Sequence, residues 1–313
     1  MTEASTVAVE QRDREQISET VLVFRRHGER ETDSSIPDKF RKLTPQGRAE
    51  AASLSPGLPL ANAVAVGGKT VDRLEENSGR LMTGDSESSL EEMREKYRGE
   101  APYPHSKLRR NAGFLDAKFE VGEYGPIFLE MYKLGKLTPW LINDSDRVAK
   151  ELGVAGQVTS FTIVAGNLAE PILGYINSAR KYRENYLAGK QPKMVDEPLA
   201  RYFTAQNSML ECLLVKIMEK TSDPDQYQKD KTELFEVIGE PGFDFLDGFT
   251  FNIKTFADSD EPEVTINFES RKKDSEDQPV YKFNRRVPAE VFEQIIEDRK
   301  NYLKGTSSAS KSA

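Results

Sequence analysis

The sequence predicts an α/β protein, a three-layer α/β/α sandwich with a mainly parallel central sheet and an inserted helical cap. Three short apolar runs, at 19–26, 61–66 and 199–205, have the composition of buried strands, and each is followed by a segment with helical periodicity. Between the second and third runs lies a long stretch that is mostly helical in pattern. From residue 243 onward, alternating apolar and polar residues are typical of paired strands.

The first predicted strand, 19–26, has V-L-V-F at its centre and leads directly into the polar segment H-G-E-R. A helix is expected after Leu43-Thr44-Pro45, because threonine is a favourable N-cap and proline suits the first helical position. The second strand, 61–66, ends at Gly67-Gly68. Apolar residues then recur at helical spacing up to Gly84, which suits the C-cap: Val71, Leu74, Leu81 and Met82.

Residues 85–195 are expected to form the inserted cap, since their pattern is mostly helical and is interrupted by proline and glycine. One face of a long helix within this stretch is apolar, and Pro171 is expected to kink it. The apolar face consists of Phe161, Val164, Leu168, Ile172, Tyr175 and Ile176.

The remaining elements belong to the core. The third strand, 199–205, precedes a helix that is apolar on nearly all sides, as in a helix buried beside a sheet. Segments 249–256 and 264–270 are expected to pair as a hairpin across D-S-D-E-P. A strand is expected at 280–286, and an amphipathic helix at 288–303.

These elements predict a single domain over 19–304, with its core at 19–84 and 196–304 and its cap at about 85–195. The two ends, 1–18 and 305–313, are polar or rich in Gly, Ser and Lys, and we expect them to be flexible tails.

Composition excludes several classes of function. The formal net charge of −8 argues against broad binding to nucleic acid or to anionic membranes, because such partners demand a basic face. Lys107, Arg109 and Arg110 form a small basic cluster, which is interpreted as a solvated loop face. The single cysteine, Cys212, excludes an intramolecular disulfide and lies in an apolar run, as expected of a small core residue. No run reaches the ~18 apolar residues of a spanning helix, and the polar N-terminus carries no leader pattern, so a cytoplasmic protein is expected.

Polar side chains gather where the three predicted strands end. The first strand ends at Arg26-His27-Gly28-Glu29-Arg30, the second is followed by Arg73 one turn into the next helix, and the third ends at Gln206. Sites in open α/β sheets form outside the carboxyl ends of the strands, so the three loops could converge. Two or three arginines gathered there would make a pocket for a dianion such as phosphate.

The motifs in these loops resemble those of the histidine phosphatase (phosphoglycerate mutase-like) superfamily. V-L-V-F-R-R-H-G-E-R is similar to its strand followed by Arg-His-Gly-Glu, and L-T-P-Q-G-R-A-E-A is similar to its L-T-x-x-G-x-x-Q-A helix start. G-G-K-T-V-D-R-L-E-E-N resembles its G-S-x-x-x-x-R-x-x-E-T segment. The resemblance covers 20–84 well and 199–256 more loosely.

The resemblance implies that His27 is the nucleophile, which attacks phosphorus to form a phosphohistidine that water then hydrolyses. Arg26 and Arg73, with Arg30 and Gln206, would hold the phosphoryl oxygens. Neither a metal nor an organic cofactor is implied. The partner would be a phosphorylated small molecule or a phosphoprotein, with no nucleic acid and no membrane.

The sequence departs from the family at the second catalytic histidine, whose matching position holds Gln206. Glutamine donates a hydrogen bond but carries no charge. Losing the charged histidine donor at this position could lower the rate by ~10²–10³. The other histidine, His105, lies in no matching context and is interpreted as an ordinary loop residue.

The identity of the general acid that protonates the leaving group is also left open. Asn207 stands where some members keep an acidic residue, so the remaining candidates are Glu120 and Glu123. Two functions follow: a phosphatase of reduced activity acting through His27, or a catalytically silent relative that binds a phosphorylated ligand or protein. A mutase is less favoured, because it must shield its phosphoryl group from water. The substrate and the oligomeric state are left open.

Overall fold

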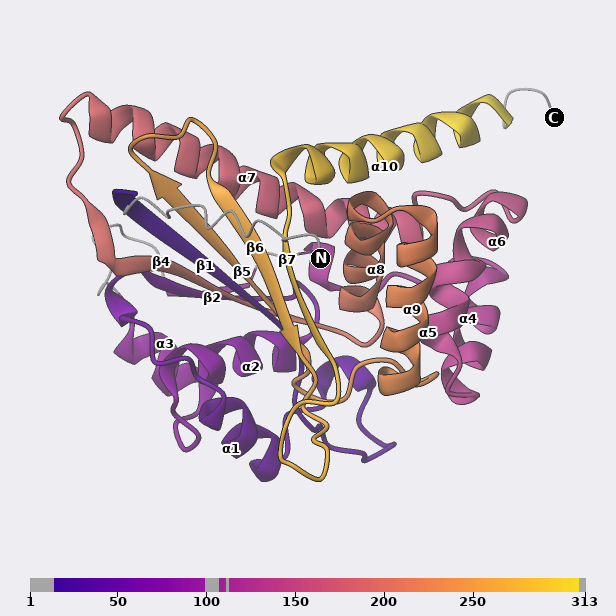
Figure 1. The fold of residues 1–313 in the computed structure, drawn as a ribbon. Helices are drawn as coiled ribbons and strands as arrows, with labels where there is room; N and C mark the ends of the chain where they lie inside the picture. Colours follow the sequence, from indigo (N-terminus) through magenta and orange to yellow (C-terminus); the bar gives the residue numbers. More distant parts are fainter. Residues whose placement is uncertain (1–13, 99–106, 111–112, 310–313) are drawn as a thin grey trace.

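The centre of the computed structural model is one seven-stranded sheet in the order β3-β2-β4-β1-β5-β6-β7 (Figure 1). The structure describes residues 14–98, 107–110 and 113–309. In sheet order, the strands are Leu108–Arg110, Ala63–Gly67, Met194–Ala205, Gln16–Arg26, Gly248–Phe256, Glu263–Glu269 and Lys282–Arg286. The α/β class predicted from the sequence is confirmed.

The sheet has a parallel half and an antiparallel half. Strands β3, β2, β4 and β1 are parallel neighbours, and the β1–β4 register aligns Phe24 with Phe203 and Arg26 with Ala205. The predicted hairpin is confirmed, because β5 pairs antiparallel with β6, and β7 continues the meander. The parallel register brings the carboxyl ends of β1, β2 and β4 to one edge of the sheet, where the three polar loops begin.

Helices cover both faces of the sheet (Figure 1). On one face lie α7 (Phe161–Leu187), α8 (Met209–Thr221) and α10 (Ala289–Ala309), and on the other lie α1 (Pro45–Ser53), α2 (Asp72–Thr83) and α3 (Leu90–Lys96). Each face has its own apolar cluster. The result is the three-layer arrangement expected from the strand-then-helix pattern.

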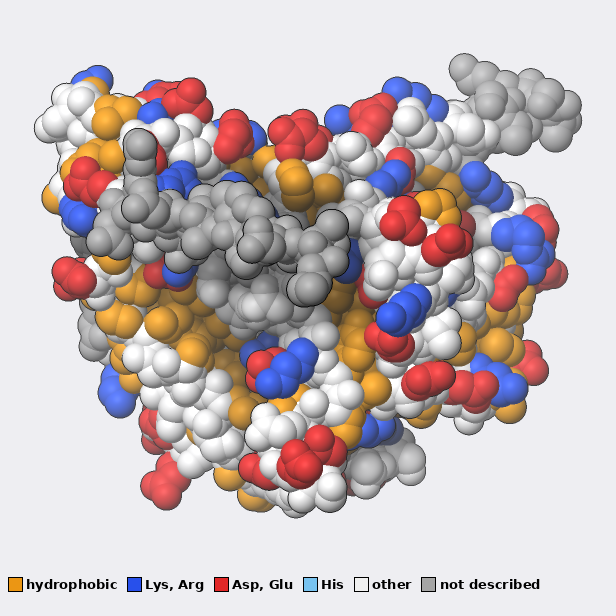
Figure 2. Space-filling model, viewed as in Figure 1, with side chains coloured by type: hydrophobic (Ala, Val, Ile, Leu, Met, Phe, Trp, Pro, Cys, Tyr) orange, Lys and Arg blue, Asp and Glu red, His pale blue; other side chains and the backbone are white. Residues whose placement is uncertain are grey.

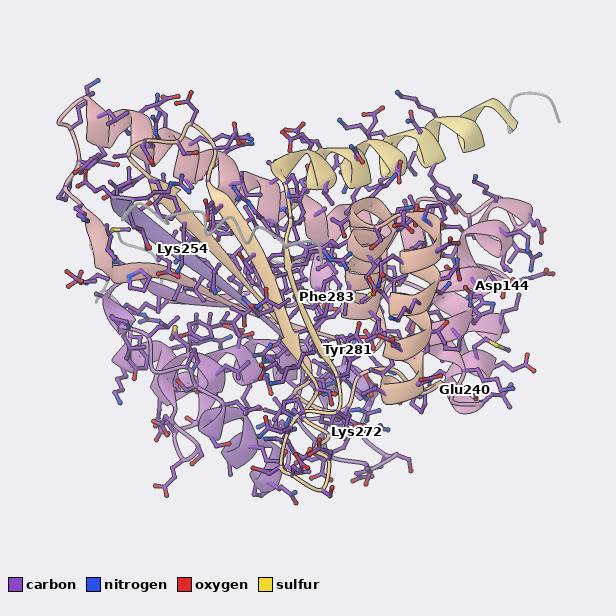
Figure 3. The ribbon with its side chains drawn as sticks, viewed as in Figure 1. Asp144, Glu240, Lys254, Lys272, Tyr281 and Phe283 are labelled. Atoms are coloured by element: carbon purple, nitrogen blue, oxygen red, sulfur yellow. The ribbon has the colours of Figure 1, made fainter. Side chains whose placement is uncertain are left out.

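Four further helices lie beyond one end of the sheet: α4 (Tyr124–Lys133), α5 (Leu137–Asn143), α6 (Ser145–Glu151) and α9 (Pro224–Ile238). Tyr281 and Phe283 lie beside α8 and α9 (Figure 3). Phe283 belongs to the apolar cluster that those helices share, and the partly buried Tyr281 packs against it. Arg285 on β7 fixes α9 through an ion pair of 2.9 Å with Asp230.

The helix ends follow the local sequence rules. The Thr44 hydroxyl accepts a 3.0 Å hydrogen bond from the Gly47 N–H, with Pro45 in the first turn. Gly84 ends α2 with a φ of 68°, in the left-handed region where glycine meets no steric penalty. These two ends are positioned as predicted.

The predicted cap boundary is wrong in two respects. Strand β3 and helix α7 both lie within 85–195, yet β3 is the edge strand of the sheet and α7 packs on β1 and β5. Helices α4 to α6 are the part of this stretch that lies beyond the sheet. The periodicity of α7 correctly shows an apolar face but does not say which layer that face contacts.

The predicted tails also differ from the structure. Strand β1 begins at Gln16, inside the predicted N-terminal tail, and α10 continues to Ala309, well into the predicted C-terminal tail. His105 lies outside the described residues.

The basic cluster is not a solvated loop face as a whole. Lys107 is buried with its ammonium donating to the Leu60 carbonyl, and Leu108–Arg110 form β3, although the Arg109 side chain is exposed. Cys212 is buried as predicted, and burial raises the pKa of its thiol.

Acidic and basic side chains are interspersed over the face seen in Figure 2, with apolar side chains visible between them. Within the described ranges, no helix combines the length and apolar character needed to span a bilayer.

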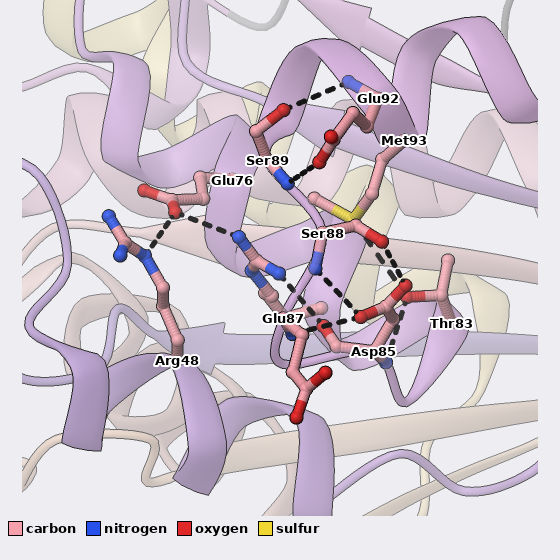
Figure 4. A network of polar contacts seen from close by, with 10 residues as sticks. Arg48, Glu76, Thr83, Asp85, Glu87, Ser88, Ser89, Glu92 and Met93 are labelled. Atoms are coloured by element: carbon pink, nitrogen blue, oxygen red, sulfur yellow. Dashed lines mark hydrogen bonds and ion pairs between the residues drawn. The ribbon is translucent and has the colours of Figure 1, made fainter.

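A buried ion triad ties α1 to α2. Glu76 accepts from Arg48 at 2.7 Å and from Arg80 at 3.2 Å, and Figure 4 shows its carboxylate beside the Arg48 guanidinium group. Glu76→Ala should lower the free energy of unfolding by about 3 kcal/mol, because it leaves the buried Arg80 charge without its carboxylate. Arg48→Ala, at a side chain that is 29% exposed, should cost less than about 1 kcal/mol. Urea denaturation measures both, and equal losses would contradict the assignment.

Candidate functional site

The three loops at the sheet edge do converge. The backbone N–H of His27 donates to the Ala205 carbonyl at 3.2 Å, which joins the first loop to the end of β4. The Gly28 N–H donates to the Asn77 side-chain oxygen at 2.9 Å, and the Asn77 amide donates to the Thr204 hydroxyl at 3.1 Å. One asparagine of α2 therefore holds the first and third loops together.

Close backbone packing explains the glycine of the H-G-E-R segment. A Cβ at Gly28 would lie 2.9 Å from the Gly47 carbonyl oxygen, and a Cβ at Gly47 would lie 2.3 Å from the Glu29 carbonyl oxygen. The loop after β1 and the first turn of α1 touch at glycines because a larger residue at either position would force them apart.

A cavity of about 490 Å³ opens where these loops meet. Its wall includes five of the residues predicted from the sequence. These are Arg26, His27, Arg30, Arg73 and Gln206. The two glutamates predicted as general acids, Glu120 and Glu123, are exposed and do not line this cavity, so that prediction is not supported by the geometry.

His27 is 4% exposed, and its Nδ1 lies 2.8 Å from the Gly28 carbonyl oxygen. A carbonyl only accepts, so Nδ1 carries the proton and Nε2 keeps its lone pair. Burial lowers the pKa of His27 to about 3, with Arg73 contributing further and the bond to Gly28 opposing. The imidazole is therefore neutral near pH 7 and has a fixed tautomer.

This tautomer and charge can be measured. Because the pKa of His27 is lowered, the neutral form should persist as the pH falls, and at pH 5 the ring should remain uncharged. An ordinary histidine of pKa 6.5 is almost fully protonated at that pH. Long-range ¹⁵N–¹H spectra should show an Nδ1–H ring that does not titrate between pH 8 and 5. The chain has two histidines, so a His105→Asn variant assigns the signals, and a midpoint near 6.5 for His27 would contradict the prediction.

Two guanidinium groups flank the imidazole. Arg26 donates from Nη1 to the Phe243 carbonyl and lies 4.6 Å from the centre of the Phe245 ring. Arg73 is 3% exposed and is held by Asp38. The Nε atoms of both arginines are buried without a hydrogen-bond partner in the described structure. An oxyanion in the cavity would supply acceptors for such donors.

Asp38 forms ion pairs with two of the arginines in the cavity wall. It lies on the short 3-10 helix Asp38–Phe40, and its carboxylate is 2.8 Å from Nη2 of Arg73 and 3.0 Å from Nη1 of Arg30. Burial opposes its ionisation, but the hydrogen bond and charge of Arg73, with the charges of Arg30 and Arg41, hold the pKa of Asp38 below its usual range. Asp38 is thus an anion near neutral pH.

Sequence reasoning missed Asp38, Arg41 and Phe245 as residues of this cavity. No local pattern marks them, because each reaches the wall through loop packing. Glu29, which also lines the cavity, belongs to the Arg-His-Gly-Glu segment, so the motif itself could have identified it. The Glu29 carboxylate accepts from the Thr44 hydroxyl at 2.7 Å.

Gln206 lies at the cavity wall, half-buried, directly after β4. Asn207 follows with its amide 3.2 Å from the Pro241 carbonyl, and Ser208 has a φ of 67°, a costly value for a residue with a Cβ. This strained turn places Gln206 in the same cavity as His27. The position predicted to replace the second histidine is therefore at the site.

No protein-family model and no curated protein matches the chain. Solved structures similar to it include a mycobacterial hydrolase at 13% identity and TM-score 0.37, covering 88% of this chain and 96% of that one. Another is a mycobacterial glucosyl-3-phosphoglycerate phosphatase at 12% identity and TM-score 0.36, and the match covers 75% of this chain and 90% of that one. A third, from Escherichia coli, is described as an α-ribazole-5′-P phosphatase. It has 10% identity and a TM-score of 0.33, and the match covers 87% of this chain and 96% of that one.

Proposed function

We propose that this chain is a histidine phosphatase that hydrolyses a phosphomonoester through a phosphohistidine at His27. The single observation that carries the proposal is the buried, neutral imidazole of His27, with Nδ1 fixed by Gly28, in one cavity with Arg26, Arg30 and Arg73. That combination supplies a nucleophile and a cluster of cations for the transferring group.

In the first step, Nε2 of His27 forms a bond to phosphorus. The ester P–O bond breaks, and its electron pair goes to the alcohol oxygen, which takes up a proton. Water then attacks the phosphohistidine, which releases inorganic phosphate and restores the neutral ring. Arg26 and Arg73 line the cavity beside the ring and stabilise the charge on the equatorial oxygens in both steps.

The site offers little help to the leaving group. Two carboxylates line the cavity, of which Asp38 is held ionised by its arginines and Glu29 accepts from Thr44. Gln206 donates a hydrogen bond but exchanges no proton near neutral pH. We therefore expect slow turnover, with a natural partner that is a phosphorylated small molecule or phosphoprotein.

A second candidate function rests on Gln206 and Asn207. Both stand where the family resemblance implies ionisable residues, and neither carries charge. A protein with this pair could bind a phosphorylated ligand or protein through its arginines without hydrolysing it. The two functions share the cavity and differ only in whether His27 becomes phosphorylated.

Trapping the phosphoenzyme tests the first function directly. The full chain is mixed with p-nitrophenyl phosphate, quenched at alkaline pH within milliseconds, digested and analysed by mass spectrometry. A phosphoryl group stable to base and labile to acid is expected on the peptide containing His27. Phosphate binding without any phosphopeptide would support the silent binding protein instead.

A further inference from the structure

The cavity wall divides into a basic end and an apolar end. The basic end is formed by His27 with Arg26, Arg30 and Arg73. The apolar end consists of Ala117, Phe119, Phe128, Leu129, Leu137 and Phe245. We infer that the ligand is an aryl phosphomonoester, with its phosphate at the arginines and its aromatic ring on the apolar end. This inference rests on the proposed function and names its substrate class.

The apolar end is a firm surface. The rings of Phe119 and Phe128 are stacked with centroids 4.5 Å apart and an interplanar angle of 2°. Trp140 supports Phe128 from behind in an edge contact at 6.2 Å. Because these rings are held by their neighbours, a ligand ring could pack on them without first ordering them.

Aromatic surface also begins directly beside the reacting atoms. The Phe245 ring centre lies 4.6 Å from the Arg26 guanidinium carbon and 5.7 Å from the centre of the His27 ring. Tyr132 joins the two ends from the α4 side, because its hydroxyl accepts from Arg30 at 3.3 Å. The ester group of a phosphate bound at Arg26 and His27 is therefore within reach of the Phe245 ring.

The apolar end disfavours the hydroxyl groups of a polyol phosphate. The six apolar side chains offer no hydrogen bond to replace the water lost by sugar or glycerol hydroxyls, and unreplaced hydrogen bonds weaken binding. A flat ring buries apolar area instead and gains from it. The volume of about 490 Å³ is in the range of sites that hold a phosphate with one or two rings.

Leaving-group chemistry points the same way. With Asp38 held ionised and Gln206 in place of a histidine, the cavity provides little proton donation. A phenolate leaves with far less assistance than an alkoxide, because phenol is the stronger acid. An aryl ester is thus the phosphomonoester that this set of residues is best suited to cleave.

Phosphonates test the binding without the complication of leaving-group reactivity. Calorimetric titration of the full chain with phenylphosphonate should give a Kd about tenfold or more below that for methylphosphonate. Hydroxyethylphosphonate should bind no more tightly than methylphosphonate. Equal affinities for all three, or no binding of any, would overturn the inference.

A matched pair of variants locates the ring. Leu129, 42% exposed at the cavity wall, and Leu134, 56% exposed at the end of the same helix and outside the cavity, are both changed to asparagine. Leu129→Asn should reduce the preference for phenylphosphonate, measured as the ratio of the two Kd values, to a third or less. Leu134→Asn should leave the preference intact, and equal effects of the two changes would count against the proposed position of the ring.

The phosphoenzyme and phosphonate experiments together separate the possible failures. A phosphohistidine at His27 with no preference for phenylphosphonate overturns the substrate class alone. The preference without a phosphohistidine overturns hydrolysis and retains the ligand class. If both hold, the kcat/KM for 1-naphthyl phosphate against that for a phosphotyrosine peptide shows whether the aryl phosphate is a free small molecule or a modified protein side chain.

Discussion

Replacing His27 by alanine should lower the turnover of p-nitrophenyl phosphate at least about 10³-fold. Arg26, Arg30 and Arg73 are cations without a lone pair to offer. The two carboxylates of the cavity are engaged, Asp38 by arginines and Glu29 by Thr44, so we expect neither to take over the role of the imidazole. The phosphoenzyme signal should vanish with the activity.

The controls distinguish lost chemistry from lost folding. His27→Ala keeps the arginines, so it should still bind inorganic phosphate, and its circular dichroism and urea midpoint are measured alongside. His105→Ala removes the other histidine of the chain and should retain the wild-type rate. Unchanged activity in His27→Ala would remove His27 as the nucleophile.

Replacing Gln206 by histidine should raise turnover by about 10²-fold, the reverse of losing one charged donor to a transferring group. The glutamine side chain is half-buried at the cavity wall and forms no side-chain hydrogen bond within the described ranges, so an imidazole could replace it without breaking such a bond. Near neutral pH the new ring can carry a proton, which glutamine cannot.

The size and kind of the gain separate the two functions. A rise in kcat with a detectable wild-type baseline supports a slow phosphatase. Activity that appears only in Gln206→His supports a protein that binds a phosphorylated ligand without hydrolysing it. Its cavity would then retain the other residues needed for catalysis. Gln206→Asn serves as the matched control, because it changes shape without adding charge and should not raise the rate. A gain in that control equal to the gain in Gln206→His would contradict the electrostatic argument.

Much of the fold and of the site was predictable because the relevant information is local. A buried strand that ends in R-H-G-E-R, and a threonine and proline that begin a helix, define their structure within a few residues. Parallel pairing then brings the ends of β1, β2 and β4 together, so the basic end of the cavity was predictable from the strand ends and the segments that directly follow them.

The errors concern contacts between distant segments. An amphipathic helix shows the same periodicity whether it covers a sheet or forms a cap, so α7 was placed in the wrong layer. Strand β3 is only three residues long and gives too short a pattern to recognise. Asp38 reaches Arg73 across 35 positions of sequence, and no motif marks that contact.

The carboxylate of Asp38 gives the arginines a resident counter-ion. A phosphate that enters the cavity must displace the Asp38 carboxylate from the arginines. The favourable free energy of binding is therefore smaller than unpaired arginines would provide. The same exchange runs in reverse when inorganic phosphate departs, because the carboxylate returns to the guanidinium groups. Under the proposed function, we expect this return of Asp38 to the arginines to favour release of the product.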